Sequence, residues 1–100
     1  MAEPVNLDLS VQEGAIVSKT LLERPSGSLT LFAFSRGQRL SPHSAPYDAY
    51  IVLLEGSLEV TIGEERAALT AGSGILMPAG VLHALEAVED ARFLLVMLRA

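Results

Sequence analysis

Two histidines carry most of the chemistry that this sequence offers, because the chain contains no cysteine and no other histidine. His43 lies in the segment SPHSAP, and His83 lies in PAGVLHALEA, 40 residues further on. Each follows a proline-containing turn at the expected entry to a strand. An imidazole titrates near neutral pH and is also a common metal ligand. Three roles are therefore open: metal ligands, neutral side chains lining a pocket, or a metal-free acid–base pair.

The remaining candidates are three carboxylates and two phenols: Asp48, Glu55, Glu86, Tyr47 and Tyr50. Glu55 precedes a glycine turn and is interpreted as a solvated turn residue. Glu86 follows His83 by three positions, so it faces the other side of a strand. The two tyrosines are either core and interface residues or pocket walls. The sequence contains no Ser-His-Asp order, no phosphate-binding glycine loop and no His-x-x-x-His helix.

The elements that position these residues are predicted to be β-strands. Apolar residues occur in short runs or alternate with polar ones, and glycine or proline interrupts them, which is typical of an all-β sandwich or barrel. The segments between the strands contain the glycine, proline and aspartate residues that turns require. We expect strands at residues 15–22, 28–35, 50–55, 58–62, 67–69, 74–77, 83–88 and 93–98.

Alternation also predicts which side chains face the interior. Leu58, Val60 and Ile62 share one face of the hairpin SLEVTIGEERAAL. Phe32, Phe34 and Phe93 add aromatic bulk to the interior or to the interface between sheets. We expect a mainly apolar pocket with the two imidazoles at one end, which is a common composition for small-molecule sites. Its predicted lining is Tyr50, Ile51, Leu53, Met77 and Leu85.

Composition limits the class of protein and its partners. One hundred residues predict one domain, residues 1–100. Half of the residues are apolar and only 19% are charged, which favours burial of some surface against another copy. A net charge of −5 without a basic run argues against nucleic acid. We expect a cytoplasmic protein, because there is no cysteine, no secretory signal and no apolar run near the roughly 20 residues of a membrane helix. Residues 1–13 are interpreted as either mobile or exchanged between subunits.

Two segments together resemble the cupin family, which has a double-stranded β-helix, or jelly-roll, fold. The family's first motif is G-x5-H-x-H-x3,4-E-x6-G, and its second is G-x5-P-x-G-x2-H-x3-N. Residues 37–56 resemble the first motif and residues 72–87 the second. The matching positions are Gly37, His43, Gly56, Gly72, Pro78, Gly80 and His83. The resemblance therefore implies a jelly-roll barrel in which His43 and His83 share a site, and it implies a homodimer.

Three positions depart from the cupin motifs: Ala45, Ala49 and Ala87. The family's usual divalent metal, such as zinc, nickel, iron or manganese, is held by three histidines and a glutamate. Only two of these ligands remain here, and stable sites use three or four. A one-residue bulge would turn Asp48 inward in place of Ala49 and complete a two-histidine, one-carboxylate site.

Two functions follow from this resemblance. The first is a small-molecule-binding cupin with a pocket at His43 and His83 and a reduced metal site. The alternative is a metal-dependent enzyme of the oxygenase or isomerase type, with Asp48 as the third ligand. A purely structural dimer is a third hypothesis, but a short domain has no need of paired histidines in order to fold. The fold alone does not choose among them.

Overall fold

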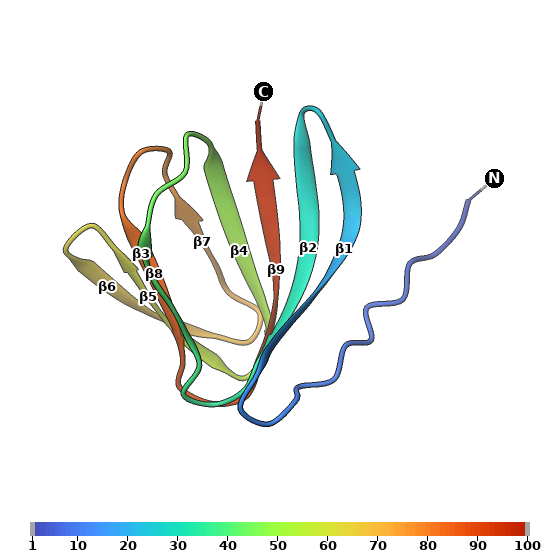
Figure 1. Ribbon diagram of the computed structural model, residues 1–100, viewed down its shortest axis with the longest axis horizontal. Coiled ribbons are helices and arrows are strands. Elements are labelled where there is room, and N and C mark those ends of the chain that lie inside the picture. The colour runs from blue at the N-terminus through green and yellow to red at the C-terminus, as the bar shows by residue number, and fades with distance from the viewer. Residues whose placement is uncertain (1, 100) are drawn as a thin grey trace.

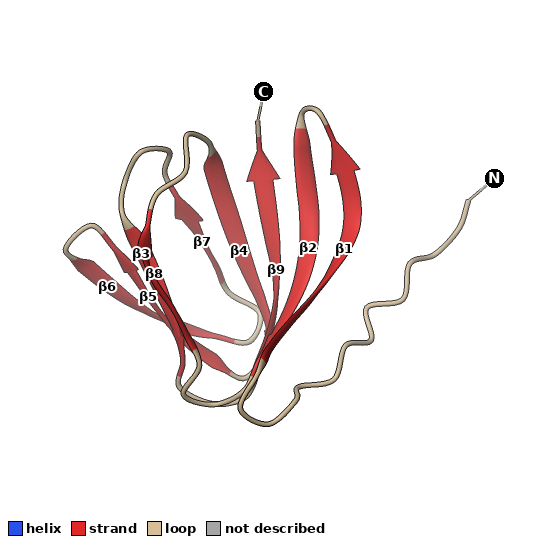
Figure 2. Cartoon of the chain, in the orientation of Figure 1, coloured by secondary structure: helices blue, strands red, loops and turns tan. Residues whose placement is uncertain are grey.

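The chain forms nine β-strands, and the computed structural model describes residues 2–99 (Figure 1). This part of the chain contains no helix, and so no helix that could span a membrane (Figure 2). The all-β prediction is therefore confirmed. The strands are β1 (Ile16–Arg24), β2 (Gly27–Phe34), β3 (Arg39–His43), β4 (Asp48–Glu55), β5 (Ser57–Ile62), β6 (Glu65–Thr70), β7 (Gly74–Met77), β8 (His83–Ala87) and β9 (Ala91–Leu98).

The strands form two antiparallel sheets that face each other. The larger sheet has the order β1-β2-β9-β4-β7, and the smaller has the order β3-β8-β5-β6. Figure 1 shows the sheets converging at one end and spreading apart at the other. Strand neighbours within each sheet are mostly not consecutive in the chain, which is the arrangement of a jelly roll. This fold brings residues from β3 and β8 next to each other across a long stretch of sequence.

The core lies between the two sheets and consists of inward-facing residues from both. On β4, the alternating residues Ala49, Ile51 and Leu53 are almost completely buried, as predicted. Phe32 and Phe93, on neighbouring strands, stack with their ring centroids 5.2 Å apart, and Phe34 packs against both. Leu58, Val60, Leu69, Met77, Leu85, Ala87 and Ala91 complete the buried cluster. The interior expected from alternation is therefore confirmed.

The sequence pattern predicts a loop for residues 39–43, whereas the structure has the strand β3 there. Pro42 lies within β3 and has no N–H to donate to a neighbouring strand, so proline is confined to edge strands and bulges. β3 is indeed the edge of the smaller sheet, and its pairing with β8 shifts register between Leu40 and His43. An exposed edge strand also lacks the apolar alternation by which strands are recognised.

The four glycines of the motifs share a backbone conformation that explains why glycine stands there. Their φ angles lie between +76° and +90°, in the left-handed region that side chains with a Cβ rarely adopt: Gly37, Gly56, Gly72 and Gly80. Gly56 has a second constraint, because a Cβ at this position would overlap the backbone carbonyl of Asp90. The turn between β4 and β5 therefore packs directly against the turn before β9.

The N-terminal segment, residues 2–14, runs along the outside of the larger sheet and away from the barrel (Figure 1). Lys19 donates to the carbonyl of Asn6 at 3.0 Å, and Arg92 donates to the carbonyl of Leu7 at 2.7 Å. Lys19 is on β1 and Arg92 is on β9, so the segment crosses over β2, which lies between them.

Candidate functional site

The two histidines meet because β3 and β8 are neighbouring antiparallel strands. His43 and His83 are register partners in this pair. Their Nε2 atoms lie 3.1 Å apart, and their ring centroids lie 4.3 Å apart with 69° between the ring planes. The register shift after Leu40 sets this pairing. Two side chains 40 residues apart therefore form a single polar site.

The other ring nitrogen of each histidine faces a backbone carbonyl. His43 Nδ1 lies 3.0 Å from the Ser41 oxygen, and His83 Nδ1 lies 3.3 Å from the Val81 oxygen. A carbonyl oxygen only accepts hydrogen bonds, so each Nδ1 carries the hydrogen in these bonds. In a neutral imidazole the second nitrogen is then an acceptor. The two Nε2 atoms point toward each other within hydrogen-bonding distance, and a hydrogen bond between them requires that one ring also carries a hydrogen at Nε2.

The two imidazoles differ in their surroundings. His83 is only 6% exposed, whereas His43 lies exposed on the edge strand. Burial lowers the pKa of His83 below its ordinary value of 6.5, and repulsion from a protonated His43 lowers that pKa further. The hydrogen bond to the Val81 carbonyl opposes both effects. His83 therefore favours the neutral form near neutral pH.

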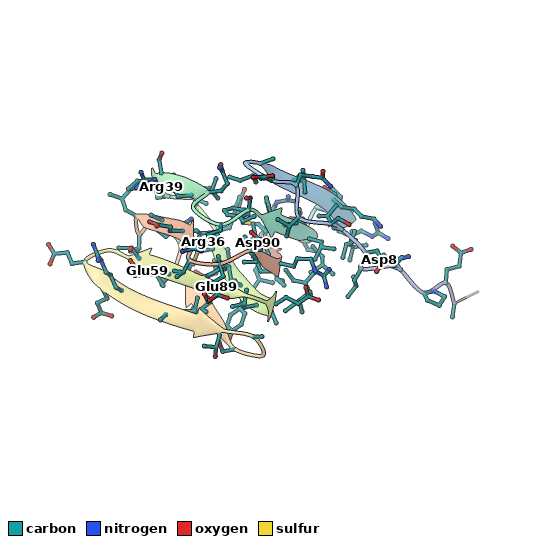
Figure 3. All side chains as sticks on the ribbon, turned by 90° about the horizontal axis from the view of Figure 1, so that it is seen from below. Asp8, Arg36, Arg39, Glu59, Glu89 and Asp90 are labelled. Atoms are coloured by element: carbon teal, nitrogen blue, oxygen red, sulfur yellow. The ribbon has the colours of Figure 1, made fainter. Side chains whose placement is uncertain are left out.

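The histidines form the polar end of a cavity of about 140 Å³ between the two sheets. Its other walls are apolar: Phe32, Leu40, Ala45, Ala49, Met77, Leu85, Phe93, Leu95 and Met97. No Asp, Glu, Lys or Arg residue is among these lining residues. None of the charged side chains labelled in Figure 3, such as Arg39, Glu59 and Asp90, lines this cavity.

The predicted lining of the pocket needs correction at three positions. Met77 and Leu85 line the cavity as predicted. Ile51 and Leu53 face the interior but are fully buried in the core and do not line the cavity. Tyr50 points away from it, because neighbouring strand residues face opposite sides and Ala49 faces inward. Its side chain is 40% exposed on the outside of the larger sheet.

The lining predicted from the sequence omits five large apolar residues of the pocket: Phe32, Leu40, Phe93, Leu95 and Met97. Leu40 belongs to the strand that was predicted as a loop. Leu95 and Met97 belong to the run FLLVML, which is apolar on both faces, so alternation did not reveal which residues point inward. The pairing of β9 with β4 shows which residues of β9 point inward, since Met97 lies opposite the inward-facing Ala49.

Asp48 does not join the histidines. Its carboxylate accepts a hydrogen bond of 2.8 Å from the backbone N–H of Ala79, in the turn after β7. The pairing of β4 with β7 and β9 is regular from Asp48 to Val52, and the bulge in β4 comes later, after Leu53. The bulge that would exchange Asp48 for Ala49 is therefore absent. The third-ligand hypothesis was wrong in its geometry.

A resident divalent metal does not fit the side chains at this site. Within residues 2–99, no group of three or more His, Cys, Asp or Glu side chains could hold a metal ion. Ala45 and Ala49, at positions where the cupin motif has a histidine and a glutamate, both line the cavity and offer no donor atom. Two imidazoles are fewer than the three or four protein ligands of stable sites.

The other candidate residues lie outside the site. Glu55 accepts two hydrogen bonds from Arg92, at 2.8 and 3.1 Å, and these bonds and the positive charge lower the pKa of its carboxyl group. Glu86 is exposed on the outer face of β8, as predicted. Tyr47 is exposed in the loop before β4 and does not line the cavity.

This combination of a jelly-roll barrel and a histidine site between the sheets defines the class of protein. The sequence model of the family described as "Cupin domain" matches residues 30–98, which include both motifs. The chain therefore belongs to the cupin family.

Solved structures agree with this assignment. A conserved protein of unknown function, SPY1581 from Streptococcus pyogenes, is 35% identical with a TM-score of 0.92, over 100% of this chain and 90% of that one. A "Cupin 2 conserved barrel domain protein" from Leptotrichia buccalis is 33% identical with a TM-score of 0.86, over 90% of this chain and 44% of that one.

One curated relative is named "Polyketide synthase CurC" and comes from Streptomyces cyaneus. It is 33% identical over 66 residues, which are 65% of this chain and 43% of the relative. The chain thus matches less than half of this relative's length.

Proposed function

We propose that this cupin domain is a small-molecule-binding module whose ligand occupies the cavity beside His43 and His83. The observation that carries the proposal is a cavity of about 140 Å³ with apolar walls and two convergent imidazole nitrogens as its polar atoms. An apolar pocket with a few converging polar groups is the usual composition of a ligand site.

The same observations disfavour the metal-dependent enzyme. That function needed Asp48 as a third ligand, and the Asp48 carboxylate is bonded to Ala79 instead. The alanines at positions 45 and 49 widen the cavity where additional ligands would stand. The protein retains the shape of a cupin site, and its donor set suits an organic ligand better than an ion.

A thermal-shift screen of small organic compounds tests this function. We expect stabilising compounds whose effect is lost in His83→Ala and in His43→Ala, because ligand binding to the folded state raises its stability. Glu86→Ala is the matched control, since Glu86 lies on the same strand as His83 but faces solvent. Stabilisation that persists unchanged in both histidine variants would contradict the assignment of the site.

We also propose that the outer face of the larger sheet pairs with a second copy of the chain. Tyr50, Leu76 and Leu98 are 40%, 44% and 51% exposed on this face. The register places four further apolar residues on this face: Leu29 on β2, Val52 on β4, and Leu94 and Val96 on β9. Leu31, also on this face, is already fully buried within one copy. Lys19 and Arg92 lie on the same face and bond to the N-terminal segment. A two-fold dimer needs a self-complementary surface, and the apolar part of this face on β4, β7 and β9 meets this need.

The N-terminal segment supports the same assignment. It carries Val5 and Leu7, which remain 54% and 41% exposed beside this face. A second copy would cover these side chains together with the sheet.

Light scattering after size exclusion tests the dimer. We expect a mass of two chains for the unmodified protein and of one chain for Leu98→Glu. Leu82→Glu is the control, because Leu82 is equally exposed but lies in the turn before β8. A monomeric unmodified protein at micromolar concentration would overturn the proposal.

A further inference from the structure

The N-terminal segment, residues 2–14, contains the sequence pattern of a β-strand. Within residues 2–99, however, no residue before Ile16 belongs to a strand. We propose that in the dimer this segment adds to the partner copy's larger sheet, as an antiparallel strand along the free edge of β7. The inference rests on the proposed dimer and extends it, because it names the segment and the edge through which the two copies are joined.

Apolar and polar residues alternate strictly in the part of the segment that reads VNLDLSVQ, residues 5–12. Its apolar members are Val5, Leu7, Leu9 and Val11. Such alternation is typical of a strand that has one covered face. In a single copy, Val5 and Leu7 are nevertheless 54% and 41% exposed. The surface that would cover this face therefore has to come from outside the single copy.

Two basic side chains hold the middle of the segment against the outer face of the larger sheet. Lys19 on β1 donates to the carbonyl of Asn6, and Arg92 on β9 donates to the carbonyl of Leu7. Between these two strands lies β2, so the segment occupies the layer above β2. Figure 3 shows Asp8 standing clear of both sheets, and Figure 1 shows the chain projecting further outward toward its N-terminus.

The strand order decides which edge of the partner the segment meets. The apolar part of the outer face lies on β9, β4 and β7, with β4 at its centre. A two-fold axis parallel to the strands through this centre places the partner's β7 over β9 of the first copy. The N-terminal segment lies directly beside it, over β2. An axis at right angles to the strands would stack β2 on the partner's β2, where the two segments would occupy the same space.

The edge of β7 has backbone groups available for another strand. In the described part of the chain, β4 is the one strand that pairs with β7. Leu53 donates to the carbonyl of Ser73 at 2.9 Å, and the register is regular over Gly74–Met77, so Ile75 is bonded to β4. The N–H groups of a strand alternate in direction, so that of Leu76 points to the free edge. Edges of this kind bind extended segments of other chains.

The direction of the chain agrees with this pairing. The segment runs opposite to β1 (Figure 1). Neighbouring strands of the larger sheet are antiparallel throughout, so β1, β9 and β7 share one direction. A two-fold axis parallel to the strands preserves these directions in the partner. The segment therefore runs antiparallel to the partner's β7, which is the slightly more stable kind of pairing.

Hydrogen exchange of single amides, measured by NMR on the full-length protein, tests this inference. The readout is the amide of Leu76, and the amide of Ile75 is the internal reference because it is bonded to β4. We expect the Leu76 amide to exchange at least about tenfold more slowly in the dimer than in the monomeric variant Leu98→Glu.

Leu7→Asp and Asn6→Asp form a matched pair, because they introduce the same charge on opposite faces of the segment. Leu7→Asp should raise the dissociation constant of the dimer at least about tenfold and remove the protection of Leu76, since the new charge would be buried. Asn6→Asp should do neither, and it keeps the oxygen that accepts from the N–H of Asp8.

The outcomes separate this inference from the proposed dimer. Fast exchange of the Leu76 amide in a protein that is dimeric by light scattering would overturn the added strand and leave a dimer of sheet faces. Protection of Leu76 that persists in Leu98→Glu or in Leu7→Asp would also overturn it, because the edge would then be covered without the segment. A monomeric unmodified protein would overturn both the inference and the proposed dimer.

Discussion

His43 and His83 are register partners on neighbouring antiparallel strands, and their Nε2 atoms face each other at 3.1 Å. Both Nδ1 atoms are held by carbonyls of the same strand or the preceding turn, which fixes the orientation of each ring. The backbone therefore orients this pair of imidazoles before any ligand arrives. Preorganisation of this kind reduces the entropic cost of binding.

Filling the cavity should abolish ligand binding without unfolding the protein. Ala49 is buried and lines the cavity, so the two additional methyl groups of Ala49→Val would occupy ligand space. We expect stabilisation by the compounds found in the thermal-shift screen to disappear, while the free energy of unfolding without ligand changes by less than about 1.5 kcal/mol. Thermal unfolding with and without ligand measures both quantities.

The control for this change is Ala68→Val. Ala68 is exposed on β6, far from the lining residues, and receives the same two methyl groups. Ligand stabilisation should be retained there. Equal stabilisation in Ala49→Val and Ala68→Val would mean that the ligand binds elsewhere.

The stability of the protein should depend on pH through His83. Because its pKa in the folded state lies below 6.5, the unfolded chain binds more protons between these two values. The stabilising contribution is therefore complete above pH 6.5 and is lost as pH falls toward the folded-state pKa. Among the titratable groups of residues 2–99, His43 alone lines the cavity with His83.

Urea unfolding at a series of pH values above about 5, where most carboxyl groups stay ionised, measures this dependence. His83→Gln should remove the loss of stability below pH 6.5, and His43→Gln should reduce it, since repulsion from His43 is the second cause of the shift. Identical pH profiles for the unmodified protein and His83→Gln would contradict the lowered pKa.

Asp48 should prove to be a turn-stabilising residue that has no role in metal binding. Asp48→Ala removes the acceptor for the Ala79 N–H and should cost about 1 kcal/mol, whereas Asp48→Asn keeps an acceptor oxygen. Protein purified without a histidine tag should contain far less than stoichiometric metal. A stoichiometric ion that is lost in Asp48→Ala would restore the metal-enzyme hypothesis.

Alanine substitutions at two glycines should distinguish the free-energy cost of backbone strain from the cost of a steric clash. Gly72 and Gly56 both have positive φ, but a Cβ at Gly72 meets no atom within 4 Å, whereas at Gly56 it overlaps the Asp90 carbonyl. We expect Gly72→Ala to cost about 1–2 kcal/mol and Gly56→Ala at least about 3 kcal/mol. Denaturant unfolding compares them, and equal costs would refute the packing of the two turns.

The sequence predicted the strands with apolar alternation well, because burial of one face leaves a period of two residues. It did not predict β3, which is exposed at the edge of a sheet and contains Pro42. That strand carries His43, so the register that pairs the histidines could not be derived from local pattern. The resemblance to the cupin motifs predicted that the two histidines share a site. Only the pairing of β3 with β8 shows which way their ring nitrogens point.

The lining of the pocket, too, could be predicted only in part from the sequence. Inward-facing residues of β4 were predicted from alternation, but alternation does not distinguish the wall of a cavity from the core beneath it. Ile51 and Leu53 therefore belong to the core, and Ala49 belongs to the cavity wall. Runs that are apolar on both faces, such as β9, remain ambiguous until strand register is known.

A crystal structure of untagged protein soaked with a stabilising compound from the thermal-shift screen tests the central claim most directly. We expect density for the compound inside the cavity, in contact with His43 or His83. An empty cavity in crystals that contain the compound bound elsewhere, or a metal ion between the two imidazoles, would contradict the proposed function.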